Sequence, residues 1–305
     1  MFDLIVVGGG PAGLTAALYA CRANKKVLVL EKGGFGGQIT FSPKVENIPG
    51  FGALSGNEFA EKMVDQVLAQ GAEFESCEVR SIRDGAVKTV VTDDGTFEAP
   101  AVILATGAKH RMLGLDREED FVGNGISFCA VCDGAFYRDQ TVGVVGGGNS
   151  ALQEALLLAE LAKKVYVIQN LDFLTGEQKL QELLLQKQNV EAILGTTVDA
   201  LSGDGELQGV RLCKTATGEK TDLALDGLFV AIGLLPQNEP FADVIALDER
   251  GYAASGEDCT TRTAGIFVAG DCRQKRIRQV TTAAADGAIA ALAACDYLDT
   301  FERKS

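Results

Sequence analysis

DLIVVGGGPAGL, residues 3–14, decides the fold of this chain of 305 residues. A buried-strand pattern at 3–7 runs into the glycine-rich turn at 8–13, and the apolar periodicity that follows predicts a helix. A second strand pattern ends at Glu31, 23 residues after Gly8. A glycine turn between a strand and a helix is the setting in which backbone N–H groups and the helix dipole bind a dinucleotide pyrophosphate.

The same unit recurs in the middle of the chain. Residues 142–168 contain a strand pattern, the turn GGGNSA at 146–151, a helix pattern and a second strand. Ala151 is small enough to replace the last glycine, and Gln169 occupies the position equivalent to Glu31. Two copies at equal spacing predict an α/β fold with two dinucleotide-binding (Rossmann-like, three-layer ββα) domains. Two ordinary glycine-rich turns in a flavodoxin-like sheet are the alternative interpretation.

Pieces that complete the first unit lie at both ends of the chain. VILATG at 102–107 ends in small residues, and GIFVAGDC at 265–272 places Asp271 just past a strand, at the edge where open α/β sheets bind ligands. We therefore expect the second domain to be inserted in the first. The expected bounds are 1–112 with 241–305 for the outer domain and 113–240 for the inner one.

Composition and charge exclude several classes of protein. The chain has 28 Lys and Arg against 42 Asp and Glu, and its net charge of −14 opposes binding to nucleic acid or anionic lipid. His110 is the single histidine, which excludes zinc sites that need two. No apolar run approaches the roughly 20 residues that span a bilayer, and no leader pattern precedes the first strand. We expect a cytoplasmic protein that binds no metal and no membrane.

Cys129 and Cys132 form the one close pair among eight cysteines. Their two-residue spacing suits a small redox-active disulfide ring and can lower the pKa of one thiol. Half of a zinc ribbon is the alternative, but zinc would need a second such pair, which the sequence lacks. Asp133 follows directly and is a candidate to hand a proton to a leaving thiolate, although an exposed turn aspartate is the simpler interpretation.

Over nearly its whole length the chain resembles the low-molecular-weight thioredoxin reductases. The matching motifs stand in family order: GGGPAG at 8–13, GGQIT at 36–40, VENIPG at 45–50, ATG at 105–107, CAVCDG at 129–134, GLFVAIG at 227–233, AGD at 269–271 and RQV at 278–280. The resemblance implies a flavoenzyme that uses FAD and a redox disulfide to reduce thioredoxin, and it implies a homodimer.

By this resemblance the outer domain binds FAD. The residues implied at the pyrophosphate, at the adenosine ribose and along the rest of the cofactor are Gly8, Gly10, Pro11, Ala12, Gly13, Glu31, Gly37, Gln38, Asn47, Ala105, Thr106, Gly107, Asp271, Arg278, Gln279 and Val280. In the inner domain, Cys132 would accept electrons from the flavin, Cys129 would attack thioredoxin, and Asp133 would be the acid. The resemblance also implies a rotation of the inner domain between these two steps. Phe136 and Tyr137 would receive thioredoxin, whereas Ala135 replaces a further aromatic residue.

The chain departs from the family where NADPH-using members carry a His-Arg-Arg stretch and a further Arg. Here residues 169–172 read Gln-Asn-Leu-Asp, and Thr175 stands in place of the last Arg. No cation remains for a 2′-phosphate, so NADPH binding is expected to be weak. The ferredoxin-dependent flavin thioredoxin reductases of anaerobes are similar in this respect, which favours reduced ferredoxin as the electron donor.

Because ferredoxins are acidic, docking would need a local basic patch on this acidic chain. The sequence offers candidates around the RQV motif and before the inserted domain: Arg273, Lys275, Arg276 and Arg278, with Lys109, His110 and Arg111. A flavin-positioning loop and a solvated turn are the alternative interpretation of these residues. Two other functions stay open: a thioredoxin reductase that uses NADH through Gln169 and Asn170, and a non-catalytic flavin redox sensor.

Overall fold

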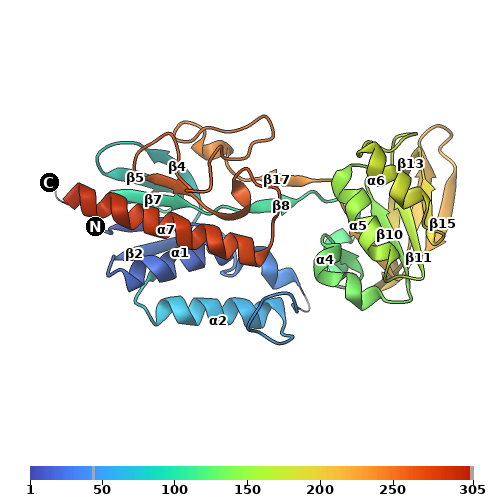
Figure 1. Ribbon diagram of the computed structural model, residues 1–305, viewed down its shortest axis with the longest axis horizontal. Helices are drawn as coiled ribbons and strands as arrows, with labels where there is room; N and C mark the ends of the chain where they lie inside the picture. The colour runs from blue at the N-terminus through green and yellow to red at the C-terminus, as the bar shows by residue number, and fades with distance from the viewer. Residues whose placement is uncertain (43–44, 303–305) are drawn as a thin grey trace. The chain divides into compact units, whose positions relative to one another are not determined.

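The computed structural model describes residues 1–42 and 45–302. The chain divides into two compact units, Met1–Lys109 with Leu235–Ser305, and His110–Leu234 (Figure 1). The bounds expected from the sequence fall after residues 112 and 240. Where the chain passes between the units, β8 (Ala108–His110) and β17 (Leu234–Pro236) form a two-stranded sheet.

The first unit is built in three layers around a parallel sheet with the strand order β18-β7-β1-β2-β3. Its strands are β1 (Leu4–Val7), β2 (Val27–Glu31), β3 (Glu73–Ser76), β7 (Ala101–Leu104) and β18 (Ile266–Val268). Helices cover one face: α1 (Pro11–Arg22), α2 (Gly56–Leu68) and α7 (Val280–Glu302). An antiparallel sheet covers the other face: β4 (Val79–Arg83), β5 (Lys88–Thr92) and β6 (Thr96–Ala99). Short 3₁₀ turns complete the unit: η1 (Gly37–Phe41), η3 (Glu239–Phe241) and η4 (Gly270–Cys272).

The apolar run in β1 is explained by burial on both faces of the sheet. Leu4 and Val6 pack with the helices, whereas Ile5 and Val7 pack with the antiparallel layer. Successive strand residues point to opposite faces, so a strand covered on both sides is apolar throughout. The same rule accounts for the lack of polar alternation in β1.

The second unit repeats this plan. Its parallel sheet has the order β12-β11-β10-β16-β9, with the strands β9 (Ile126–Ser127), β10 (Thr141–Val145), β11 (Lys164–Ile168), β12 (Val190–Ile193) and β16 (Gly227–Val230). Its helices are α3 (Glu118–Phe121), α4 (Ala130–Asp133), α5 (Asn149–Ala159) and α6 (Gln178–Leu185). The 3₁₀ turn η2 (Gly134–Tyr137) directly follows α4. The antiparallel layer is β13 (Thr196–Asp204), β14 (Glu206–Lys214) and β15 (Lys220–Ala224).

Side chains of β10 divide between two cores as those of β1 do. Val142 and Val144 pack with α5, and Val145 packs with the antiparallel layer. Two Rossmann-like units with the predicted α/β fold class are therefore confirmed.

Each parallel sheet needs a glycine where its first strand turns into the helix. Gly8 has φ +112° and Gly146 has φ +133°, a conformation that residues with a Cβ rarely adopt. A Cβ on Gly8 would overlap the Ala105 carbonyl, and one on Gly146 would approach the Ala231 carbonyl. Both glycines therefore allow backbone from a neighbouring strand to come close at the carboxyl edge of the sheet.

α7 is the longest helix, with 23 residues, and it packs along α1. A Cβ on Gly287 would overlap the Ala12 carbonyl, so the two helices approach closely there. Among the residues that the structure describes, neither α7 nor any other helix has the length and apolarity to cross a bilayer.

Candidate active site

Glu31 joins the glycine-rich turn of the first unit to the loop after β2. Its Oε2 accepts a hydrogen bond from Gly9 N–H at 2.7 Å, and its Oε1 accepts one from Gly33 N–H at 2.8 Å. Gly36 N–H donates to the Gly9 carbonyl at 2.8 Å, and an added Cβ on Gly37 would lie 3.0 Å from Gly10 Cα. The structure thus brings the predicted residues Gly10, Glu31 and Gly37 together at the start of α1.

Two further turns predicted from the sequence, at 105–107 and 269–271, also lie next to the start of α1. The Ala105 carbonyl lies against Gly8, and Gly270 lies against Ala12. Pro11 and Gly13 stand in the first turn of α1 beside them, and Gly107 follows Thr106. Gly8, Ala12, Ala105 and Gly270 therefore line one edge of the sheet.

Asn238 links these turns by hydrogen bonds, and no sequence motif indicates this role. It is fully buried; Thr106 Oγ1 donates to its Oδ1 at 3.0 Å, and its Nδ2 donates to the Cys272 carbonyl at 2.6 Å. Its Nδ2 also donates to the Gly251 carbonyl at 2.9 Å. A buried amide with all these partners fixes the backbone on either side of it.

Asp271 has an oxygen that lacks a partner. Its Oδ1 is buried and accepts no hydrogen bond from the described residues. Burial raises the pKa of this carboxyl group, and nearby Lys275 and Arg278 oppose the rise. An unpartnered buried oxygen next to a glycine-lined turn fits a ligand that offers hydroxyl groups, as the ribityl and ribose parts of FAD do. The residues present therefore fit the cofactor that the sequence resemblance implies.

The residues of the RQV motif lie close to Asp271. Arg278 Nε donates to the Asp271 carbonyl at 3.3 Å, and its guanidinium lies 4.2 Å from the centre of the Tyr252 ring. Asn47 Nδ2 donates to Gln279 Oε1 at 3.2 Å, so two predicted residues far apart in sequence meet. Val280, at the start of α7, packs on the small apolar cluster of Val45, Ile48 and Phe59. Gln38 Nε2 donates to the Ala108 carbonyl at 3.0 Å.

Part of the basic patch expected from the sequence is not a free surface charge. Arg273 and Lys275 are almost fully buried and bind Asp286 of α7, each at 2.8 Å. Burial lowers the pKa of His110 to about 4, so this ring is uncharged at neutral pH. Arg273 and Lys275 therefore share an ion-pair partner inside the first unit, and His110 adds no charge at neutral pH, so these three residues do not form an exposed basic patch.

Replacing Asp286 by Asn is expected to destabilise the first unit by about 3 to 5 kcal/mol, because two buried cations lose their counter-ion. Burial alone would raise the pKa of Asp286, but the bonds from Arg273 and Lys275 lower it overall. This stabilisation is present above the carboxyl pKa of the unfolded chain and is lost as the pH falls through the lower folded value. Denaturant unfolding should therefore show that the difference in free energy of unfolding between the wild type and Asp286→Asn becomes smaller below about pH 4. The exposed Asp299→Asn change on the same helix should cost about 0 to 1 kcal/mol, and an equal cost for both would contradict the prediction.

The two motif cysteines form a disulfide in the second unit. Cys129 precedes α4, and its Sγ accepts a hydrogen bond from Cys132 N–H at 3.2 Å. Ser127 Oγ donates to Asp133 Oδ2 at 2.6 Å and accepts from Cys129 N–H at 3.1 Å. Ser127, which the sequence analysis missed, therefore connects the predicted acid to the redox ring. Val131, which stands between the two cysteines in the sequence, has an exposed side chain.

The ring of Tyr137 is half-buried in the second unit. It packs edge-on against Phe229 at 5.3 Å and lies over Gly227, and burial raises its pKa to about 12. The docking role of Tyr137 stays a prediction. Phe136 is half-buried and Ala135 is exposed.

The second glycine-rich turn differs from the first in its surroundings. Gln169 is buried, lies over Gly147 and donates to the Phe173 carbonyl at 3.4 Å. The N–H groups of Thr175 and Gly176 both donate to the Gly147 carbonyl at 2.8 Å. Residues 169–177 contain two acids and no Lys or Arg. This segment therefore covers one side of the turn and presents no cation to a phosphate.

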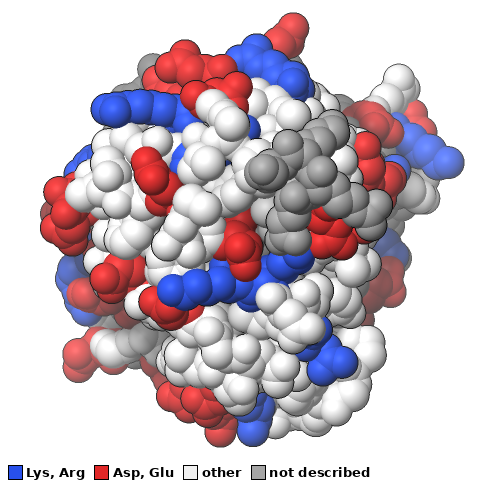
Figure 2. All heavy atoms as spheres, turned by 90° about the vertical axis from the view of Figure 1, so that its left-hand side faces the viewer, with Lys and Arg blue, Asp and Glu red and all other residues white. Residues whose placement is uncertain are grey.

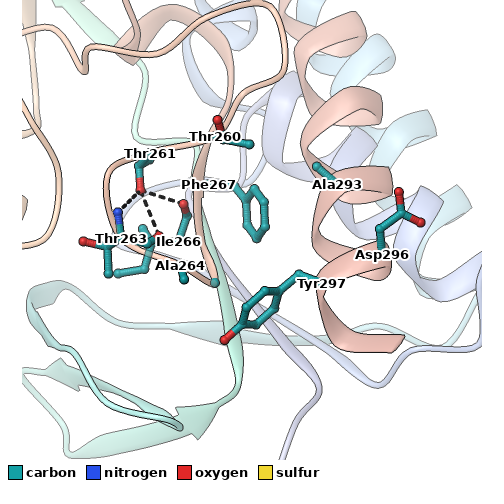
Figure 3. Close-up of a pocket in the computed structure, with 10 residues that line it drawn as sticks. Thr260, Thr261, Thr263, Ala264, Ile266, Phe267, Ala293, Asp296 and Tyr297 are labelled. Carbon is teal, nitrogen blue, oxygen red and sulfur yellow. Dashed lines mark hydrogen bonds between the residues drawn. The ribbon is translucent and has the colours of Figure 1, made fainter. Parts of the chain in front are cut away.

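A pocket of about 420 Å³ lies in the first unit (Figure 3). Thr260, Phe267 and Tyr297 are among its lining residues, and Ile266 places it at the amino end of β18. Asp271 follows the opposite end of this strand, so the pocket is not part of the site above.

On the face shown in Figure 2, Lys and Arg lie among Asp and Glu, and the described residues there form no broad area of one sign.

Comparison with known proteins agrees with this geometry. The model of the family "Pyridine nucleotide-disulphide oxidoreductase" matches residues 2–287. The thioredoxin reductase of Treponema pallidum (strain Nichols) is 41% identical over 99% of this chain and 98% of its own length. The thioredoxin reductase of Listeria monocytogenes serovar 1/2a (strain ATCC BAA-679 / EGD-e) is 40% identical over 98% and 94%. The crystal structure of thioredoxin reductase from Streptococcus pyogenes MGAS5005 superposes with a TM-score of 0.93 at 41% identity, over 98% of this chain and 99% of that one. The chain therefore belongs to the pyridine nucleotide-disulphide oxidoreductases and, within them, to the thioredoxin reductases, which are FAD-binding flavoproteins.

Proposed function

We propose that this protein reduces the disulfide of thioredoxin through Cys129 and Cys132 and that its electrons come from reduced ferredoxin. The observation that carries the choice of donor is the segment at 169–177, which has two acids and no cation beside the second glycine turn. The first glycine turn, in contrast, is closed by Glu31 and lies near the unpartnered Asp271 oxygen. One unit is thus suited to FAD, and the other to carrying the disulfide without a dinucleotide.

FAD, when bound, supplies the ability to collect single electrons and to pass on a pair. Two electrons open the Cys129–Cys132 bond, and one proton leaves a thiol and a thiolate. The Cys129 thiolate then attacks the thioredoxin disulfide, and a mixed disulfide forms as the other thioredoxin sulfur leaves. Asp133, which Ser127 holds at 2.6 Å, gives that sulfur its proton. Cys132 then attacks the Cys129 sulfur, and its proton passes to the second thioredoxin sulfur as that sulfur leaves, so reduced thioredoxin is released and the disulfide is restored. Solvent returns a proton to Asp133.

Several residues of the first unit would hold FAD. Glu31 would accept from the adenosine ribose, Asp271 would accept from a cofactor hydroxyl, and the glycine turn would face the pyrophosphate. Arg278, Gln279 and Asn47 would lie along the flavin end. The homodimer and the rotation of the second unit that the resemblance implies are part of the same proposal.

Ferredoxin is a sufficient donor on energetic grounds. A plant-type ferredoxin near −400 mV and thioredoxin near −270 mV differ by about 130 mV, which is about 6 kcal/mol for two electrons. NADPH binding would need cations for its 2′-phosphate, and Asp172 and Glu177 would oppose that group. NADH is disfavoured because Gln169, a neutral amide, stands where an NAD site carries an acidic ligand for the ribose hydroxyls.

Steady-state assays with three donors test this function. Purified holoenzyme and thioredoxin are mixed anaerobically with reduced ferredoxin, NADPH or NADH, and new thioredoxin thiols are counted. We expect ferredoxin to support turnover at a rate at least about 100-fold above NADPH, as the loss of two charged hydrogen bonds to the 2′-phosphate implies. We also expect ferredoxin to support faster turnover than NADH. A comparable rate with NADH would support the NADH-dependent alternative. Rapid turnover with any donor would exclude a non-catalytic redox sensor.

Replacing Asp271 by Ala is expected to weaken FAD binding by about 10-fold to 150-fold, because a hydrogen bond to a charged acceptor is worth about 1.5 to 3 kcal/mol. Quenching of flavin fluorescence by the apoprotein gives the dissociation constant without any turnover. Asp296→Ala removes an exposed acid from α7 and should leave the constant unchanged. Equal affinities for all three proteins would show that Asp271 does not bind the cofactor.

A further inference from the structure

Two side-chain oxygens in the described part of the chain are buried without a hydrogen-bond partner, Asp271 Oδ1 and Glu154 Oε2. The proposed FAD site accounts for the first. Glu154 lies in α5 of the second unit, and the reaction described above gives it no part. Buried unpartnered oxygens are uncommon in folded proteins, so this one needs its own explanation.

Glu154 contacts the turn that carries the redox disulfide. Its carboxyl group lies close enough to the backbone N–H of Ala130 for that amide to favour the ionised form. Ala130 is buried, follows Cys129 directly and begins α4, which packs against α5 (Figure 1). The carboxyl group therefore lies at the amino end of α4, where Cys129 caps the helix.

We propose that Glu154 is a positioning residue of the redox site. Its side chain holds the Ala130 amide and with it the turn between the two cysteines. Its charge sets how readily the neighbouring dithiol ionises once the disulfide is open. The inference rests on the proposed role of Cys129 and Cys132, but it does not depend on which donor reduces the flavin.

The ionisation of Glu154 falls in the range where the enzyme would work. Burial raises its pKa to about 7, and the Ala130 amide opposes this rise only in part. Opening the disulfide with two electrons and one proton leaves a thiolate, and a proton on Glu154 offsets the new negative charge. An ionised Glu154 disfavours that thiolate, and the coupling is reciprocal.

The elements that pack against α5 carry other titratable groups. These are Cys132 and Asp133 on α4, Lys179 and Glu182 on α6, Lys164 and Tyr166 on β11, and Tyr137 on η2, whereas β10 carries none. None of these charges causes the shift of Glu154, which comes from burial. Glu154 can therefore be tested separately by removing its charge alone.

Alkylation of the reduced protein measures this coupling without turnover. Holoenzyme is reduced with dithiothreitol, desalted without oxygen and treated with iodoacetamide between about pH 6 and pH 8.5, a range that spans the expected change at Glu154. Mass spectrometry of the peptide that contains Cys129 and Cys132 gives the rates. Glu154→Gln keeps a side-chain oxygen beside the Ala130 N–H but cannot ionise. We expect equal rates with the wild type near pH 6 and rates roughly threefold to tenfold higher in the variant near pH 8.5.

Two further variants separate charge from position. Glu160→Gln removes a carboxylate from the end of the same helix that is exposed and paired with Lys187, and it should match the wild type throughout. Glu154→Ala loses the side-chain oxygen beside the Ala130 N–H and should differ from Glu154→Gln even near pH 6. A constant rate ratio across the pH range for Glu154→Gln would overturn the charge coupling. Equality of the Ala and Gln variants near pH 6 would overturn the positioning role.

Discussion

Replacing Cys129 or Cys132 by Ser is expected to lower thioredoxin reduction by roughly 1,000-fold or more, the largest effect of any single change in this protein. Both sulfurs are needed because an electron pair enters as one bond opens and leaves as another forms. A serine oxygen cannot form the disulfide that accepts the pair. Thiol counting on thioredoxin measures the loss, and the flavin absorbance of each variant shows that the first unit still holds its cofactor.

The matched control is Cys213→Ser, which changes a half-buried free thiol in the same unit. It should leave turnover unchanged. The two motif variants should also differ from each other when mixed with oxidised thioredoxin after reduction, because only Cys132→Ser keeps the attacking Cys129 and can trap a mixed disulfide. Retention of turnover in the double Ser variant would show that another group carries the electrons.

Introducing arginine at positions 171 and 175 is expected to raise kcat/KM for NADPH by roughly 100-fold to 10,000-fold. Leu171 and Thr175 are exposed and lie in the segment beside the second glycine turn, so each new guanidinium is free to reach a 2′-phosphate. Two charge-assisted hydrogen bonds of about 1.5 to 3 kcal/mol each account for this range. NADPH oxidation with thioredoxin as acceptor measures the gain.

The control is the pair Leu185→Arg and Thr221→Arg, which adds the same charge at exposed positions elsewhere in the second unit. It should leave NADPH use low, because general attraction of an anion is screened by salt. Ferredoxin-supported turnover should persist in both double variants. If the designed pair behaves like the control, the absence of cations is not what prevents NADPH use.

Local patterns were enough to predict the fold. The apolar runs at 3–7 and 142–145 lie in β1 and β10 because both faces of these strands are covered. The antiparallel layers could not be placed strand by strand. β15 reads Lys-Thr-Asp-Leu-Ala and is mostly exposed, so its sequence has no alternation that distinguishes it from a loop.

Contacts over long distances in sequence were beyond prediction from the residues. Thr106 meets Asn238 across 132 positions, and Arg273 forms an ion pair with Asp286 of α7. Charge counting treated Arg273 as a surface cation, because its partner becomes a neighbour only in the folded chain. Glu154 was missed for the same reason, since nothing in its local sequence relates it to Ala130.

Anaerobic titration of the oxidised flavoprotein tests the proposed electron path most directly. Reduced ferredoxin, NADPH and NADH are added in separate experiments while the flavin absorbance is followed. The proposal predicts that ferredoxin bleaches the flavin and that oxidised thioredoxin restores the colour, whereas equal amounts of NADPH or NADH leave it almost unchanged. Rapid bleaching by NADPH, with no response to ferredoxin, would contradict the account.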